Sequence, residues 1–281
     1  MKVAGIVVCN PDYNRLIENI NVLHPQVDRI AVYLNSEINR SRLNGLDKLQ
    51  YLSDGNNRGI ATALNAIMSY ADKLGADWCL LLDQDSVVSK KCVEGYEKYK
   101  NLDNAAILTP FIHDDRDMEK QETAVETHTE IDMCITSGSY NNIELWKKEK
   151  GFRDEFFIDY VDWEYCARVR SRGYKVYRIN EMIIDHQLGS KTYHKILWWN
   201  VFTYNHNAFR KYYITRNTIV TYRLFPDEIK LAHPYLRTWK RLLFTILFEE
   251  EKGKKTRAIL RGVLDSGKLY RELKGKQEYG Y

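Results

Sequence analysis

Short apolar runs recur along the first 110 residues and alternate with helical patterns. The runs lie at 3–9, 28–34, 77–82 and 104–109. Nearly continuous runs of this length are typical of strands buried on both faces of a sheet. One helical pattern begins after the polar turn Asn10-Pro11-Asp12, which offers an N-cap, and another follows Gly59 and stops at Gly75. This alternation predicts a βαβ sheet.

The loops that follow these strands are the expected place for a ligand. In open α/β sheets ligands bind beyond the carboxyl ends of the strands, where helix N-termini offer amides to anions. That rule predicts a phosphate-bearing ligand in one crevice. The segments expected around this crevice are Asn10 to Asp12, Asn35-Ser36, Asn57 to Ala61 and Asp83 to Ser86.

The strict alternation ends near residue 110. The stretch 113–130 is rich in Asp, Glu and Thr and predicts a loop or flap, so residues 131–190 must complete the site. No repeat or Pro/Gly-rich linker separates the halves. We therefore expect one domain over 1–225 and a basic amphipathic helical region over 226–281.

Asp83-Gln84-Asp85 ends a buried strand and is the strongest candidate for metal chemistry. Two carboxylates separated by one residue suit Mg²⁺ or Mn²⁺, and a cation held there can bridge a diphosphate. Asp115-Arg116-Asp117 has the same spacing, but it lies in a predicted loop, where solvated surface charge is the simpler interpretation.

Two further clusters allow structural and functional interpretations alike. Asp162 and Glu164 lie where a helix is predicted to start, so Asp162 can be an N-cap and Glu164 can pair with Arg168 four residues later. His186 follows the apolar pair Ile183-Ile184, at the end of a predicted strand. A lone histidine is more often structural than a ligand.

In order and spacing these elements resemble the inverting family 2 glycosyltransferases, and among them the bacterial rhamnosyltransferases that use dTDP-L-rhamnose. The likeness spans most of residues 3–225. It is carried by Asn57 to Asn65, Gly75 to Trp78, Asp83 to Ser86, Thr136 to Ser139, Phe157 to Asp162, His186 to Gly189 and Tyr212 to Asn217. The resemblance implies a GT-A fold, which is a Rossmann-like α/β mixed sheet flanked by helices, here with a C-terminal helical appendage. It also implies a divalent metal and inversion at the anomeric carbon.

The resemblance also implies roles for individual residues. Asp162 would be the catalytic base. Asp85 and His186 would be metal ligands, and Asp83 would lie near the metal and the donor's ribose or sugar. The other implied groups are acceptor-positioning Glu164, Ser137 and Gly138, and nucleotide-sugar-binding Asn10, Pro11, Asn35, Asn57, Gly59, Asp83 and Gln84.

The implied roles agree with the chemistry of inverting transfer. Such transfer needs one carboxylate to take the acceptor proton, while a metal stabilises the departing diphosphate. The chain departs from the family at Leu34-Asn35, where many members have Asp-Asn after the second strand. It also has Val161-Asp162 in place of Glu-Asp, a form that the rhamnosyltransferases share. The resemblance thus predicts rhamnosyl transfer from dTDP-L-rhamnose to a saccharide or lipid-linked saccharide in surface polysaccharide synthesis.

Composition and charge set the expected location and partners. The five cysteines are scattered without a CxxC pair, which favours a reducing, cytoplasmic compartment. Residues 229–281 carry a net charge of +7 and the rest −3. Within this basic tail, Leu231, Leu236, Trp239, Leu242, Leu243, Ile246 and Leu247 recur at roughly helical spacing. Such a helix suits the inner face of the cell membrane, a homodimer interface, or packing on the body. No base-reading motif indicates nucleic acid.

Three alternatives to rhamnosyl transfer stay open on the sequence. The first is a transferase that uses a UDP-sugar. The second is a catalytically silent protein that binds nucleotide sugars or membranes, against which the intact set Asp83, Asp85, Asp162 and His186 argues. The third is a nucleotidyltransferase, which would usually carry a Gly-rich basic loop near the first strand; Asn10 to Asn14 lacks one.

Overall fold

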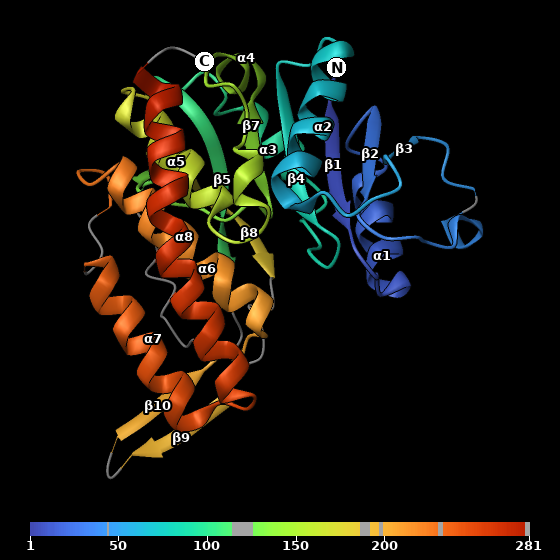
Figure 1. The fold of residues 1–281 in the computed structure, drawn as a ribbon. Helices are drawn as coiled ribbons and strands as arrows, with labels where there is room; N and C mark the ends of the chain where they lie inside the picture. Colours follow the sequence, from blue (N-terminus) through green and yellow to red (C-terminus); the bar gives the residue numbers. More distant parts are fainter. Residues whose placement is uncertain (44, 114–125, 186–191, 197–198, 230–232, 279–281) are drawn as a thin grey trace. The chain divides into compact units, whose positions relative to one another are not determined.

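A computed structural model describes all 281 residues except 44, 114–125, 186–191, 197–198, 230–232 and 279–281. The chain forms two compact units (Figure 1). The first comprises Met1–Phe157 and Val161–Gln187, and the second comprises Ile158–Tyr160 and Leu188–Tyr281.

The first unit alternates strands and helices. In chain order its elements are β1 (Val3–Val8), α1 (Tyr13–Leu23), β2 (Arg29–Leu34), the 3-10 helix η1 (Arg40–Leu43), β3 (Leu49–Leu52), α2 (Gly59–Lys73), β4 (Trp78–Asp83), α3 (Cys92–Glu97), β5 (Ala105–His113), β6 (His128–Ile131), β7 (Ser139–Asn142), α4 (Ile143–Lys148), the 3-10 helix η2 (Asp154–Phe156), α5 (Val161–Ser171) and β8 (Lys175–Asp185). The predicted strands near residues 3, 28, 77 and 104 are all present.

The eight strands of this unit form one mixed sheet in the order β3-β2-β1-β4-β7-β5-β8-β6. Strands β1 to β4 run parallel to one another, whereas β7 is antiparallel to β4 and β5, and β6 is antiparallel to β8. The chain proceeds from β1 outward to β3 and then returns to place β4 on the other side of β1. The strand order therefore switches between β1 and β4, where such sheets form their ligand crevice.

Helices α1 and α2 cover opposite faces of β1. The apolar side chains of α1 share a core cluster with Ile6 and Val8. Successive residues of a strand face opposite sides of the sheet, so Gly5 lies on the side opposite to Ile6 and Val8. There α2 packs so closely that a Cβ on Gly5 would lie 2.1 Å from Cγ2 of Ile67. The predicted helix starts are confirmed as well, since Asp12 caps α1 with its carboxylate and α2 begins at Gly59.

The second unit is mostly helical. It contains an antiparallel hairpin of β9 (Thr192–Ile196) and β10 (Trp199–Thr203), followed by α6 (Ala208–Leu224), α7 (Pro234–Phe248) and α8 (Lys252–Glu278). Helices α6, α7 and α8 contact one another (Figure 1). Glu249 follows α7 and is buried with Lys211 of α6 and Lys255 of α8, both of which bind its carboxylate. A charged cluster thus ties the three helices together.

The structure differs from two expectations about organisation. The boundary predicted at residue 225 falls inside the second unit, because α6 packs mainly against α8 and belongs with the C-terminal helices. Part of the loop predicted at 113–130 is strand β6, which pairs with β8; Asp115 to Asp117 lie outside the described residues. None of the described helices is long and apolar enough to cross a membrane.

Candidate functional site

The carboxyl ends of β1 and β4 are joined by one side-chain amide. The Gln84 oxygen accepts the N–H of Cys9 at 2.8 Å, and its amide nitrogen donates to the Cys9 carbonyl at 3.2 Å. Gln84 therefore extends the sheet pairing one step past Asp83, the last residue of β4. In this position it ties together the segments that follow β1 and β4.

The predicted nucleotide-sugar residues gather around the start of α2. The Asn35 side chain is buried; its oxygen accepts the N–H of Arg58 at 3.0 Å and its amide donates to the carbonyl of Gly59 at 3.1 Å. The Asn57 oxygen accepts the N–H of Gly59 at 3.0 Å, and the N–H of Asn10 donates to the Ser36 hydroxyl at 2.8 Å. These asparagines fix the loop that leads into α2. Pro11 is half-buried between Asn10 and the α1 cap.

Gly59 brings α2 against the segment that leads to the predicted base. Its φ is +83°, in the left-handed region that favours glycine. A Cβ there would lie 2.5 Å from the carbonyl oxygen of Phe157, which accepts the N–H of Ile60 at 2.5 Å. Only glycine allows this approach.

The two carboxylates of the Asp-Gln-Asp sequence are the candidate metal ligands. Asp83 is half-buried at the end of β4, and Asp85 is exposed in the turn that follows. Oxygen ligands spaced this way fit a hard divalent cation. Within the described residues no three His, Cys, Asp or Glu side chains form a metal-binding group. The third predicted ligand, His186, lies outside the described residues.

Asp162 is half-buried and accepts hydrogen bonds from the backbone. It lies in the first turn of α5, and its two oxygens accept the N–H of Trp163 at 2.9 Å and of Thr136 at 3.2 Å. Burial raises the pKa of its carboxyl from 3.8 to about 6; these two N–H groups oppose the rise and the negative charge of Asp83 adds to it. A carboxylate poised near neutral pH is suited to accept a proton.

The backbone is strained just before Asp162. Phe157, Asp159 and Tyr160 all have positive φ, of 47°, 62° and 67°. Non-glycine residues in this region cost about 1 kcal/mol or more each, and such strain tends to cluster at functional sites. Within the second unit, residues 158–160 are held by α6: the Asn217 amide donates to the carbonyls of Ile158 and Asp159 at 3.0 and 2.8 Å. The Asp159 carboxylate also pairs with Arg210.

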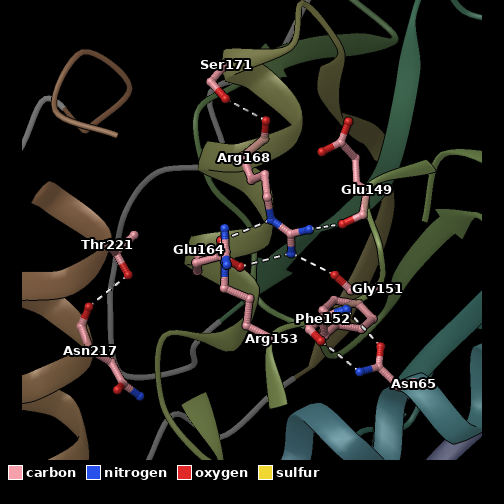
Figure 2. A network of polar contacts seen from close by, with 10 residues as sticks. All are labelled: Asn65, Glu149, Gly151, Phe152, Arg153, Glu164, Arg168, Ser171, Asn217 and Thr221. Carbon is pink, nitrogen blue, oxygen red and sulfur yellow. Dashed lines mark hydrogen bonds and ion pairs between the residues drawn. The ribbon is translucent and has the colours of Figure 1, made fainter. Parts of the chain in front are cut away.

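Glu164 does not have the position that an acceptor-contacting residue needs. Figure 2 shows its fully buried carboxylate between two guanidinium groups, Arg153 at 2.6 Å and Arg168 at 3.0 Å. Arg168 in turn donates to the carbonyls of Glu149 and Gly151. The acceptor-positioning role is therefore corrected, and the i,i+4 pair with Arg168, the structural alternative, is present.

Ser137 and Gly138 are also buried, so neither is placed to touch an acceptor. The Ser137 hydroxyl accepts the N–H of Asp83 at 3.3 Å, and the N–H of Gly138 donates to the Leu81 carbonyl at 2.9 Å. They fix the loop at the end of β4 instead. Sequence reasoning missed Thr136, although it opens the same four-residue motif, because its contribution to Asp162 comes from the backbone.

The described part of the chain thus brings Asp83, Gln84 and Asp162 into one unit with the loop at the start of α2. Asp162 and Asp83 are close enough for the charge of one to affect the pKa of the other. Gln84 and the asparagines order the segments after β1 and β4 and before α2, while Asp85 is exposed. The positive end of the α2 dipole favours an anion, and the Asp162 carboxylate can take a proton.

Comparison with known sequences gives one relative along most of the chain. No protein-family model matches. A curated protein of Shigella flexneri, the dTDP-rhamnosyl transferase RfbF, is 28% identical over 265 residues, which cover 87% of this chain and 85% of that protein. The chain thus resembles a rhamnosyltransferase well beyond the short motifs.

Solved structures share the fold. PcManGT, a mannosyltransferase from Pyrobaculum calidifontis solved with GDP-Man and Mn²⁺, has a TM-score of 0.57 at 11% identity, covering 99% of this chain and 79% of that one. Residues 1–349 of S. aureus TarS with UDP-GlcNAc score 0.57 at 13% identity, with 100% and 92% covered. GalNAc-T7 with UDP, GalNAc and Mn²⁺ scores 0.61 at 11% identity over 92% of this chain, which spans only 54% of that one. The predicted GT-A fold is confirmed.

Proposed function

We propose that this chain is an inverting glycosyltransferase that moves L-rhamnose from dTDP-L-rhamnose onto a hydroxyl of a saccharide or lipid-linked saccharide. The observation that carries the proposal is Asp162, a carboxylate near Asp83 with a pKa of about 6 at the first turn of α5. The resemblance to a dTDP-rhamnosyl transferase supports the donor. The fold shared with structures that hold UDP-sugars and GDP-Man supports a nucleotide-sugar site.

In this proposal Asp162 removes the proton of the acceptor hydroxyl as that oxygen attacks the anomeric carbon. The bond from the acceptor oxygen to the anomeric carbon forms on the face opposite the nucleoside diphosphate, which departs with the electrons of the broken bond. The backbone N–H groups of Thr136 and Trp163 fix the carboxylate. Holding the acceptor in line with the anomeric carbon supplies much of the remaining acceleration.

The donor nucleotide occupies the crevice between the ends of β1 and β4. Its phosphates lie toward the N-terminus of α2, where the helix dipole favours negative charge. Asn10 and Asn35 keep the neighbouring loops in place through the hydrogen bonds described above. Glu164 supports this site indirectly, by holding α5 to the segment around Arg153.

A divalent cation, Mg²⁺ or Mn²⁺, completes the proposed site. Asp85 and Asp83 would hold it with His186, and when bound it would supply positive charge for the departing diphosphate. The Mn²⁺ in two of the structures that share the fold is consistent with this assignment. We place the reaction in the cytoplasm, where nucleotide sugars and scattered free cysteines both fit.

The proposal is tested by measuring nucleoside diphosphate released from a panel of nucleotide sugars. The assay uses Mn²⁺ or Mg²⁺, then EDTA, then the Asp162→Asn variant; slow hydrolysis needs no known acceptor. Turnover of dTDP-L-rhamnose that is lost with EDTA and in the variant supports donor, metal and base together. Turnover of a UDP-sugar alone would overturn the rhamnose assignment. If no donor turns over and none binds in a metal-dependent way, the enzyme assignment is wrong.

A further inference from the structure

Helix α7 has its apolar side turned outward. Two polar residues, Thr238 and Thr245, are among the buried residues of this helix. Six of its large apolar side chains lie on the opposite side and are exposed, with Trp239 at 69% and Leu236 at 64%. The exposed set recurs at helical spacing and comprises Tyr235, Leu236, Trp239, Leu243, Ile246 and Leu247, here called the α7 outer face. A helix packed only for its own stability buries such a stripe.

The charges around the α7 outer face are positive. The helix carries Arg237, Lys240 and Arg241 and has no acidic residue. Lys240 is exposed and borders the stripe, whereas Arg241 turns inward and donates to the Thr215 hydroxyl at 3.3 Å. The next acid along the chain, Glu249, is buried against two lysines. Exposed Glu250 and Glu251 lie beyond the helix, and Glu251 pairs with Lys254.

We infer that the α7 outer face docks on an anionic phospholipid surface, independently of the reaction proposed above. Trp and Tyr beside leucines, with Lys240 at the border, match the apolar boundary and charged headgroups of such a bilayer. A second copy of the chain fits less well, because α7 has no acidic residue that could pair with Lys240 of a partner copy. Lipid phosphate supplies the missing negative charge.

Vesicle co-sedimentation of the full chain tests the inference. We expect binding to vesicles that contain phosphatidylglycerol, weak binding to pure phosphatidylcholine, and weakening with salt. Trp239→Ser should weaken binding about tenfold, because the variant lacks the exposed indole that the wild type would bury in the lipid on binding. Lys240→Glu should weaken it about tenfold or more. Lys98→Glu, an equal charge reversal at an exposed position of the first unit, should have little effect.

Trp239→Phe separates insertion from folding, since it keeps an apolar ring and removes one of six tryptophans. This variant should still bind, while the blue shift of tryptophan fluorescence on adding vesicles should largely disappear. Equal losses for Lys240→Glu and Lys98→Glu would overturn the inference, because binding would then follow net charge alone. It would also be overturned if sedimentation velocity shows a dimer that Trp239→Ser dissociates, or if the wild-type chain ignores anionic vesicles.

Discussion

Replacing Asp162 by asparagine should greatly slow turnover and change how stability depends on pH. Its folded-state pKa, about 6, lies above the ordinary 3.8. Between these values the folded state binds the proton and the unfolded state does not, so the free energy of unfolding falls as pH rises from about 4 to about 6. A shift of this size is worth about 3 kcal/mol, at about 1.4 kcal/mol for each pKa unit. The asparagine side chain of the variant cannot titrate, so the variant does not incur this loss.

The assay is urea unfolding of the wild type and Asp162→Asn from pH 4 to pH 8. The other titrating groups largely cancel in the difference, so the variant should gain about 2 to 2.5 kcal/mol relative to the wild type between pH 4 and pH 7. Asp227→Asn, at an exposed carboxyl, controls for the loss of one carboxylate. Over the same range the wild-type kcat/KM should rise to a plateau above about pH 6, with turnover in the variant lower by about 10²- to 10⁴-fold. A flat stability difference would refute the desolvated carboxylate on which the assignment of the base rests.

Three further substitutions test the packing around the site and in the second unit by urea unfolding. Gly59→Ala should lower the free energy of unfolding by about 3 kcal/mol, because the new Cβ would lie 2.5 Å from a carbonyl oxygen. Gly55→Ala, also at positive φ but with open space around it, should lower it by about 1 kcal/mol. Equal losses would mean that only the backbone angle φ matters. Glu164→Ala should lower the free energy of unfolding by about 3 to 5 kcal/mol, because it leaves two arginines without their buried partner. A loss of activity without a loss of stability would instead indicate a direct role for Glu164 in the reaction. Glu249→Gln should cost about 3 kcal/mol and exposed Glu250→Gln almost nothing; similar values would show that the buried lysines are not charged.

The sequence predicted those parts of the fold that leave a local pattern. Continuous apolar runs revealed β1 and β4, and the polar turn before α1 indicated its cap at Asp12. Strand β3, with residues Leu49–Leu52, was missed because it is only four residues long and half of it is polar or aromatic. The hairpin of β9 and β10 was missed too, since its pairing is not visible in either strand alone.

The site shows the same limit at the level of single residues. Asp162 was recognised as chemically important, and its backbone partners came from the structure, since an N–H group is the same in every residue. For Glu164 the spacing to Arg168 was visible, whereas Arg153, eleven residues earlier, was not. This second arginine changes Glu164 from an acceptor contact into a buried structural charge. The outward turn of α7 also depends on which side its neighbours cover, and a helical pattern does not contain that information.

The central claim is that Asp162 drives inverting transfer from dTDP-L-rhamnose. Time-resolved proton NMR follows the donor signal and identifies the first anomer of the released sugar. The sample contains dTDP-L-rhamnose and the full chain in a buffer with Mg²⁺ and without Mn²⁺, and water is the acceptor. The account predicts metal-dependent loss of the donor, first appearance of the opposite anomer before mutarotation, and no reaction with Asp162→Asn. Formation of the retained anomer first, or wild-type rates in the variant, would contradict it.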